Sequence, residues 1–210
     1  MNEAGLNARW LKAGLESGET KKFAVSVLNH MREKLIGYQM EYGNLYGLEA
    51  TPAESATFRF ARLDRERFSG IRTAGHEGDV PYYTNSTKMP ADYDGTLQDA
   101  LINQDSLPPL STKGTVFHVY MERELEDWKK ARDLLSSMIT EHHIPCFTLS
   151  PVYTICQTCG YLPGRQERCP KCNGAADVYS RIAGYYRPVH DWNDGKAQEF
   201  RNRIMFRIGE

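Results

Sequence analysis

Two Cys-x-x-Cys pairs constrain the fold of this chain more than any other feature of its sequence. Cys156 and Cys159 form the first pair, Cys169 and Cys172 form the second, and nine residues separate the pairs. Each pair can aim two thiolates at one point, and four soft thiolates at tetrahedral positions suit zinc best. The spacing therefore predicts a zinc site in a short hairpin ribbon, with iron or a redox dithiol as the alternatives.

The role of this site is open between a structural clip and a nucleic-acid-binding ribbon. A metal clip allows a short, loop-rich segment to fold, and Gly160 and Gly174 would give the two turns their backbone freedom. A nucleic-acid-binding ribbon is expected to be basic, but the 26 Lys and Arg residues are balanced by 27 Asp and Glu residues. The charge balance favours the clip and predicts no nucleic-acid partner.

The remaining sequence features predict a cytoplasmic protein without a membrane partner. The chain has no apolar run long enough to span a bilayer, and its N-terminus lacks a signal-peptide pattern. Clustered cysteines in a reducing compartment are typical of metal sites rather than of disulfides. Cys146 stands apart from the cluster and is predicted to be a small buried side chain on a strand, without a catalytic role.

Helices and strands are predicted to alternate before residue 150. Apolar spacing indicates helices at about 20–42, 51–68, 94–106 and 124–142, and strands at 45–50, 80–84, 114–120 and 146–149. The clearest helix start is at Thr51, the expected N-cap, because Pro52 follows it and Glu54 would complete a capping box. A last helix is predicted at 194–206. Such alternation favours parallel βα units in an open sheet or part of a barrel.

Several segments carry a family resemblance. Residues 181–185 read R-I-A-G-Y and residues 192–196 read W-N-D-G-K. The first segment is similar to the glycyl radical signature, and the second is similar to the tail of anaerobic (class III) ribonucleotide reductases. In that family, too, a four-cysteine zinc site precedes the radical loop. Further segments match in the family's order and cover nearly the whole chain: 48–54, 82–87, 114–116 and 147–151.

The resemblance implies an α/β fold with three parts. Residues 1–150 would form a partial (half) βα barrel, the second half of the glycyl radical enzyme barrel. Residues 151–176 would form the four-cysteine zinc ribbon, and 177–210 the C-terminal glycyl radical loop and tail. The family's full chains are much longer and carry a regulatory cone and a first barrel half that holds the thiyl cysteine. The chain is therefore expected to be a C-terminal part or split subunit that needs a second polypeptide for catalysis.

The resemblance also implies a chemistry for Gly184. Loss of a hydrogen from its Cα would leave a planar, delocalised radical that any side chain would crowd. The family implies that a radical-SAM activating enzyme, which carries an iron–sulfur cluster, installs this glycyl radical. A transient thiyl radical would then act on a ribonucleotide, expected to be a triphosphate, with formate as reductant, to make deoxyribonucleotides for DNA synthesis. The loop is expected to be buried yet able to leave, and the complete enzyme is expected to be a homodimer.

Two groups of polar residues are weaker candidates for the substrate site. Glu49 lies at a predicted strand end before a helix, where a carboxylate could exchange protons with the ribose hydroxyls. Substrate phosphate or ribose could be bound by Asn85, Ser86 and Thr87. The alternative for these three residues is a polar turn followed by a helix cap.

Two functions without catalysis remain open. The chain could be a spare-part glycyl radical domain that repairs an oxygen-damaged reductase, which predicts rescue of the cleaved enzyme on mixing. It could also be a zinc-ribbon binding module, which predicts retention on nucleic acid that is lost as salt is raised.

Overall fold

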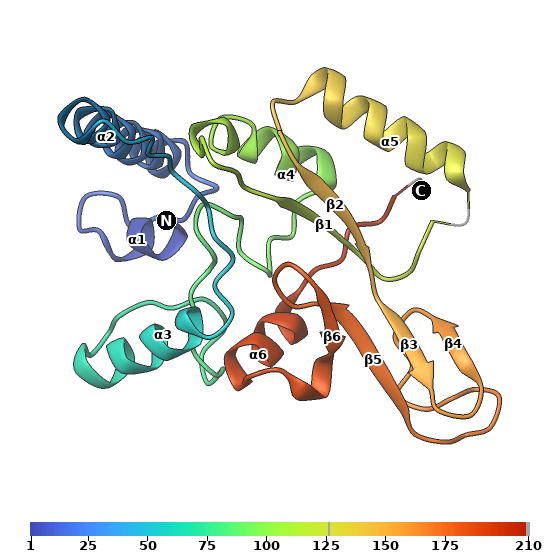
Figure 1. The fold of residues 1–210 in the computed structure, drawn as a ribbon. Coiled ribbons are helices and arrows are strands. Elements are labelled where there is room, and N and C mark those ends of the chain that lie inside the picture. Colours follow the sequence, from blue (N-terminus) through green and yellow to red (C-terminus); the bar gives the residue numbers. More distant parts are fainter. Residues whose placement is uncertain (126, 209–210) are drawn as a thin grey trace.

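The computed structural model describes residues 1–125 and 127–208, whose strands form two small sheets among six α-helices (Figure 1). The helices are α1 (Asn2–Asn7), α2 (Gly18–Tyr42), α3 (Ala56–Arg67), α4 (Leu97–Gln104), α5 (Trp128–Glu141) and α6 (Asp194–Asn202). The strands are β1 (Phe117–Met121), β2 (Phe147–Pro151), β3 (Tyr153–Cys156), β4 (Gly160–Pro163), β5 (Ala176–Arg181) and β6 (Tyr186–Pro188). In the part of the chain that the structure describes, no helix is both long and apolar enough to cross a membrane.

β1, α5 and β2 form one parallel βαβ unit. The strands pair from Phe117 opposite Phe147 to Met121 opposite Pro151, and α5 makes the connection between them. Their shared core is closed by α4, which lies beside α5 in Figure 1. The buried members of this core are Leu101, Val119, Met121, Met138 and Ile144. The strands predicted at 114–120 and 146–149 are therefore present, displaced by one to three residues.

The strands predicted at 45–50 and 80–84 are wrong. Each segment makes only an isolated bridge, the first between Glu49 and Gly114 and the second between Ala74 and Tyr82. An extended segment becomes a strand only where a neighbour runs beside it over several residues and forms a ladder. Within the described residues the predicted alternation therefore reduces to one βαβ unit. The half barrel stays a prediction from the family resemblance.

The capping box predicted at residue 51 is also wrong. α3 begins at Ala56, with Ser55 as its N-cap. The preceding segment is held open by a distant contact, because the Ala53 amide donates to Asn85 Oδ1 at 2.8 Å. In a helix capped by Thr51, the Thr51 side chain could accept from the Ala53 amide. Here that amide donates to Asn85 instead, so the predicted cap does not form.

The second sheet is antiparallel and has the strand order β4-β3-β5-β6. Only Val152 separates β2 from β3, so the two sheets join end to end. The rings of Tyr153 on β3 and Tyr179 on β5 stack with centroids 5.3 Å apart. α6 packs against this sheet through a cluster made by Val152, Ile182, Trp192 and Phe200. This packing positions the connection between β5 and β6.

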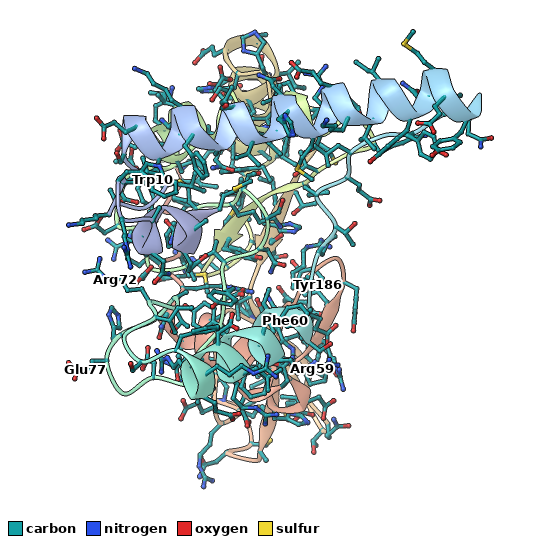
Figure 2. All side chains as sticks on the ribbon, turned by 90° about the vertical axis from the view of Figure 1, so that its left-hand side faces the viewer. Trp10, Arg59, Phe60, Arg72, Glu77 and Tyr186 are labelled. Atoms are coloured by element: carbon teal, nitrogen blue, oxygen red, sulfur yellow. The ribbon has the colours of Figure 1, made fainter. Side chains whose placement is uncertain are left out.

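α2 confirms the long helix predicted at 20–42. Ser17 caps its N-terminus, and Gly43, at φ +70°, ends it in the left-handed conformation. Its buried residues are confined to the first three turns: Thr20, Ala24 and Leu28. The second half projects past the rest of the molecule (Figure 2), where Met40 is exposed.

Candidate functional site

The four cysteine sulfurs converge at one end of the second sheet. All four Sγ atoms lie within 4.8 Å of one another, and those of Cys156 and Cys172 are 3.6 Å apart. A Zn–S distance of about 2.3 Å places thiolates of a tetrahedral site roughly 3.8 Å apart. A disulfide would need an S–S distance of about 2.05 Å. The donor set therefore fits one tetrahedral zinc ion, as the spacing predicts.

The first cysteine pair lies on the turn between β3 and β4. Cys156 is the last residue of β3, and the Cys159 amide donates to its sulfur at 3.4 Å. Gly160 then starts β4 with φ +76°, a conformation that favours glycine. The expectation that Gly160 gives this turn its backbone freedom is thus confirmed.

The second pair lies in the loop that precedes β5. The Asn173 amide donates to the Cys169 carbonyl at 2.8 Å, and Asn173 takes the left-handed conformation at φ +56°. The expectation that Gly174 supplies this conformation is therefore wrong. A Cβ at Gly174 would lie 3.3 Å from the Cys172 sulfur, so the glycine there leaves room for the thiolate.

Gly184 lies in the short connection between β5 and β6. The connection is closed by the Ile182 amide, which donates to the Tyr185 carbonyl at 3.0 Å. Gly184 is not in the left-handed region, and a Cβ added to it would meet nothing within 4 Å. Neither backbone conformation nor packing within the described residues requires a glycine here. This absence weakens the interpretation of Gly184 as an ordinary turn glycine.

The predicted burial of the radical loop holds only in part. Ile182 and Ala183 are buried, but Gly184 and Tyr185 are exposed. The physical reason is that the side chains of Ile182 and Ala183 pack inward while the turn itself stands clear of the described residues. Burial of Gly184 would need a covering surface beyond them.

Arg181 binds the backbone of Gly184. Its Nη1 donates to the Gly184 carbonyl oxygen at 2.6 Å, and its Nε donates to Ser150 Oγ at 3.0 Å. The guanidinium also lies over the Tyr186 ring, 4.8 Å from the centroid. The sequence pattern places Arg181 in the signature but gives it no role; the structure makes it the residue that anchors the Gly184 carbonyl to β2.

Glu54 holds the outer side of the same loop, and we call its two contacts the Glu54 latch. Tyr185 Oη donates to Glu54 Oε2 at 3.0 Å, and Arg187 Nη1 lies 3.5 Å from Glu54 Oε1. Sequence reasoning missed this role because it assigned Glu54 to the capping box. No local signal could have revealed it, since the partners are more than 130 residues away.

Of the weaker candidates, Asn85 lines a cavity together with Ile182 and Ala183, whereas Glu49, Ser86 and Thr87 are not on its walls. Glu49 is exposed, at its bridge with Gly114. Asn85 Oδ1 accepts a hydrogen bond from the Ala53 amide, and Ser86 is exposed with φ +47°. Thr87 is buried, and its carbonyl accepts from the Gln104 side chain. Their substrate roles stay predictions. Cys146 is exposed, so its predicted burial is wrong because it precedes β2 rather than lying in it.

A buried ion network lies behind the loop. Glu199 of α6 bonds to Lys196 Nζ at 2.5 Å and to Arg203 Nη2 at 2.8 Å. Burial raises the pKa of the Glu199 carboxyl, but the attraction of Lys196 and Arg203 outweighs burial and holds that pKa at about 2. Arg203 also donates to the carbonyl oxygen of Arg181 at 3.0 Å. The network thus connects α6 to the strand end that carries Arg181.

Comparison with known proteins relates this arrangement to one family. A family model described as anaerobic ribonucleoside-triphosphate reductase matches residues 1–206. The anaerobic ribonucleoside-triphosphate reductase of Haemophilus influenzae is 24% identical over 95% of this chain. Those of Escherichia coli and enterobacteria phage T4 are 23% and 25% identical over 86% and 85% of it. This chain covers 29%, 26% and 30% of the three relatives.

Solved structures share the fold. One anaerobic ribonucleotide reductase superposes with a TM-score of 0.72 at 22% identity, over 90% of this chain and 29% of that one. The Thermotoga maritima enzyme in complex with dATP and CTP superposes with a TM-score of 0.68 at 23% identity, over 87% of this chain and 29% of that one. Because the family model matches nearly the whole chain, this chain belongs to the anaerobic ribonucleoside-triphosphate reductase family, and it spans under a third of the length of these relatives.

Proposed function

We propose that this chain is the radical-storing part of an anaerobic ribonucleotide reductase and that Gly184 holds the radical. One observation carries this proposal. The backbone conformation at Gly184 does not require a glycine, yet the Gly184 carbonyl accepts a 2.6 Å hydrogen bond from Arg181. A radical at the Gly184 Cα would be delocalised onto that carbonyl, and a cationic donor strengthens the bond to an oxygen that gains electron density.

The four cysteines have a positioning role in this proposal. Zinc, when bound, would supply a structural link rather than a reaction step. It would tie the end of β3, at Cys156, to the loop that leads into β5. β5 ends at Arg181, so the metal link fixes the strand that holds the Gly184 carbonyl.

The other parts of the reaction are proposed from the family. The cysteine that forms the thiyl radical would lie outside these 210 residues, in the same polypeptide or in a second one. A radical-SAM enzyme would activate Gly184, ribonucleoside triphosphates would be the substrates, and formate would be the reductant. Glu49 is proposed to exchange protons with the substrate, because its exposure leaves its carboxylate open to an adjoining part of the enzyme.

Gly184→Ala is expected to abolish the radical without unfolding the chain. The added methyl group meets nothing within 4 Å, so the fold should tolerate it, while the alanine Cα cannot host the same planar radical. The measurement is electron paramagnetic resonance after anaerobic incubation with the activating enzyme, S-adenosylmethionine and a reductant. The unchanged chain should give a doublet, and the variant should give none.

Gly37→Ala is the matched control. Gly37 is also free of contacts within 4 Å of an added Cβ, but it lies in α2, away from the loop. This variant should keep the doublet, and air should then cleave it near residue 184 as it cleaves the unchanged chain. A doublet that survives Gly184→Ala, or intact signal-free protein from the unchanged chain, would contradict the proposal.

A further inference from the structure

A small cavity lies behind the buried side of the 182–185 connection. Its volume is about 90 Å³, and its walls come from residues 82–93, α4, β1, α6 and the two residues that precede Gly184, with flanking residues. The ionisable side chains on its walls include Lys88, His118, Lys196, Glu199 and Arg203.

The charges around the cavity do not balance. Lys88, Lys196 and Arg203 are three basic residues, and Glu199 is the one acidic residue among the described residues of the wall. Glu199 already bonds to both Lys196 and Arg203. A buried cation without a counter-charge is unfavourable, because water no longer solvates it. The walls therefore hold an excess of positive charge.

Lys88 carries the unmatched charge. Within residues 1–125 and 127–208 its ammonium forms no hydrogen bond or ion pair. Burial lowers the pKa of Lys88 to about 8, partly offset by attraction to Glu199. Lys88 therefore stays cationic at neutral pH, and three N–H donors face the cavity without an acceptor.

Two further donors on the same walls lack partners. His118 Nε2 and Arg203 Nε are both buried, and neither has a hydrogen-bond partner among the described residues. Arg203 Nε always carries a proton, so it is a donor. Native structures rarely leave buried donors unpaired, and such atoms indicate a bound group or a water that completes them.

A hydrogen-bond chain can place the single proton of His118 on Nε2. Arg181 can only donate, so Ser150 Oγ accepts from it and is free to donate to Thr148 Oγ1, 2.9 Å away. Thr148 can then donate to His118 Nδ1 at 2.7 Å. Burial lowers the pKa of His118 to about 3, so the ring is neutral at pH 7 and Nε2 is its donor. All three unpaired groups are then donors.

We propose that this cavity binds a small oxyanion, of the carboxylate or phosphate class, among Lys88, His118 and Arg203. A water needs roughly 10–15 Å³ of such space, so a cavity of about 90 Å³ has room for a small ligand of several heavy atoms. Donors without acceptors select an anion over a cation or a neutral amide. The proposal does not depend on the radical function, because no step in it involves Gly184.

The test is titration of the 210-residue chain with sodium formate and, separately, with inorganic phosphate. Amide chemical shifts are followed by nuclear magnetic resonance at constant ionic strength against sodium chloride. Saturable shifts are expected at Lys88, His118 and Ala183 with at least one of the two anions, and the anion that saturates identifies the class. Lys88→Met should weaken that binding about tenfold or more, since it removes a charge-assisted contact.

Lys34→Met is the matched control, because Lys34 is exposed on α2 and should leave binding unchanged. A second measurement needs no variant: the saturating anion should raise the pKa of Lys88, read from its side-chain ¹³C shift. Absence of saturation with both anions, equal binding by Lys88→Met, or a His118 proton on Nδ1 in ¹⁵N spectra would each overturn the proposal.

Discussion

Cys169→Ser is expected to abolish zinc binding and to unfold the ribbon formed by β3, β4 and the loop before β5. The ribbon has little core of its own, since its buried cluster consists of Cys156, Leu162 and Cys169. Structural zinc contributes roughly 10–16 kcal/mol of binding free energy in small metal domains, most of which folds the segment. Losing one of four thiolates removes most of that contribution. The measurements are zinc content per chain and limited proteolysis between residues 164 and 175.

Cys146→Ser is the control for this experiment. Cys146 is exposed and lies outside the four-cysteine cluster, so the substitution should change neither zinc content nor proteolysis. Because β5 leads from the ribbon to Arg181, Cys169→Ser should also reduce the radical signal from Gly184. A Cys169→Ser protein that keeps one zinc ion per chain and resists protease would show that the metal link is not needed.

Glu199→Gln is expected to lower the free energy of unfolding by about 3–5 kcal/mol. The side chains of Lys196 and Arg203 are each 1% exposed, and both bond to the Glu199 carboxylate. The substitution keeps the shape of the side chain but leaves two buried cations without their counter-charge. Urea unfolding at pH 7, extrapolated to water, measures the loss.

Glu167→Gln provides the contrast, because Glu167 pairs with Arg165 at 3.4 Å but is 82% exposed. Water screens such a pair, so its removal should change stability by less than about 1 kcal/mol. Adding Lys196→Met to Glu199→Gln should restore part of the lost stability, since one buried charge then disappears. Equal effects of Glu199→Gln and Glu167→Gln would refute a stabilising role for the buried network.

The Glu199 network also predicts a dependence of stability on acid. The pKa of Glu199 is about 2 in the folded chain, below its ordinary value of 4.5, so the folded state favours the ionised carboxylate. Its contribution is fully present above pH 4.5 and is lost as pH falls from 4.5 through 2. The stability difference between the unchanged chain and Glu199→Gln should therefore shrink over this interval. A constant difference would contradict the depressed pKa.

The features that could be predicted from sequence are those that depend on nearby residues. The two cysteine pairs predict a site that the structure assembles, because each pair lies on one tight turn. α2 and α5 could be predicted because the apolar spacing and the capping residues of a helix can be read from consecutive residues. The elements that failed, at 45–50 and 80–84, depend on whether a distant neighbour runs alongside.

The residues that surround Gly184 could not be predicted, because long-range contacts gather them. Arg181, Ser150, Thr148 and His118 form a hydrogen-bond chain that joins β5, β2 and β1. Glu54 is a second example. Its local sequence pattern indicated a helix cap, but its carboxylate contacts Tyr185 and Arg187 instead. The spacing of residues along the chain does not show whether a local or a distant partner will bind a given side chain.

The Glu54 latch holds the outer turn of the loop weakly, whereas the strand beneath the turn is held strongly. Its contacts to Tyr185 and Arg187 are partly exposed, and exposed pairs contribute about 0–1 kcal/mol each. The strand beneath is anchored by a metal site and by a buried ion network. We therefore expect the outer turn to open with a small fraction of the free energy of global unfolding. The exposed turn that carries Gly184 could then move away from the rest of the molecule while the stem stays folded.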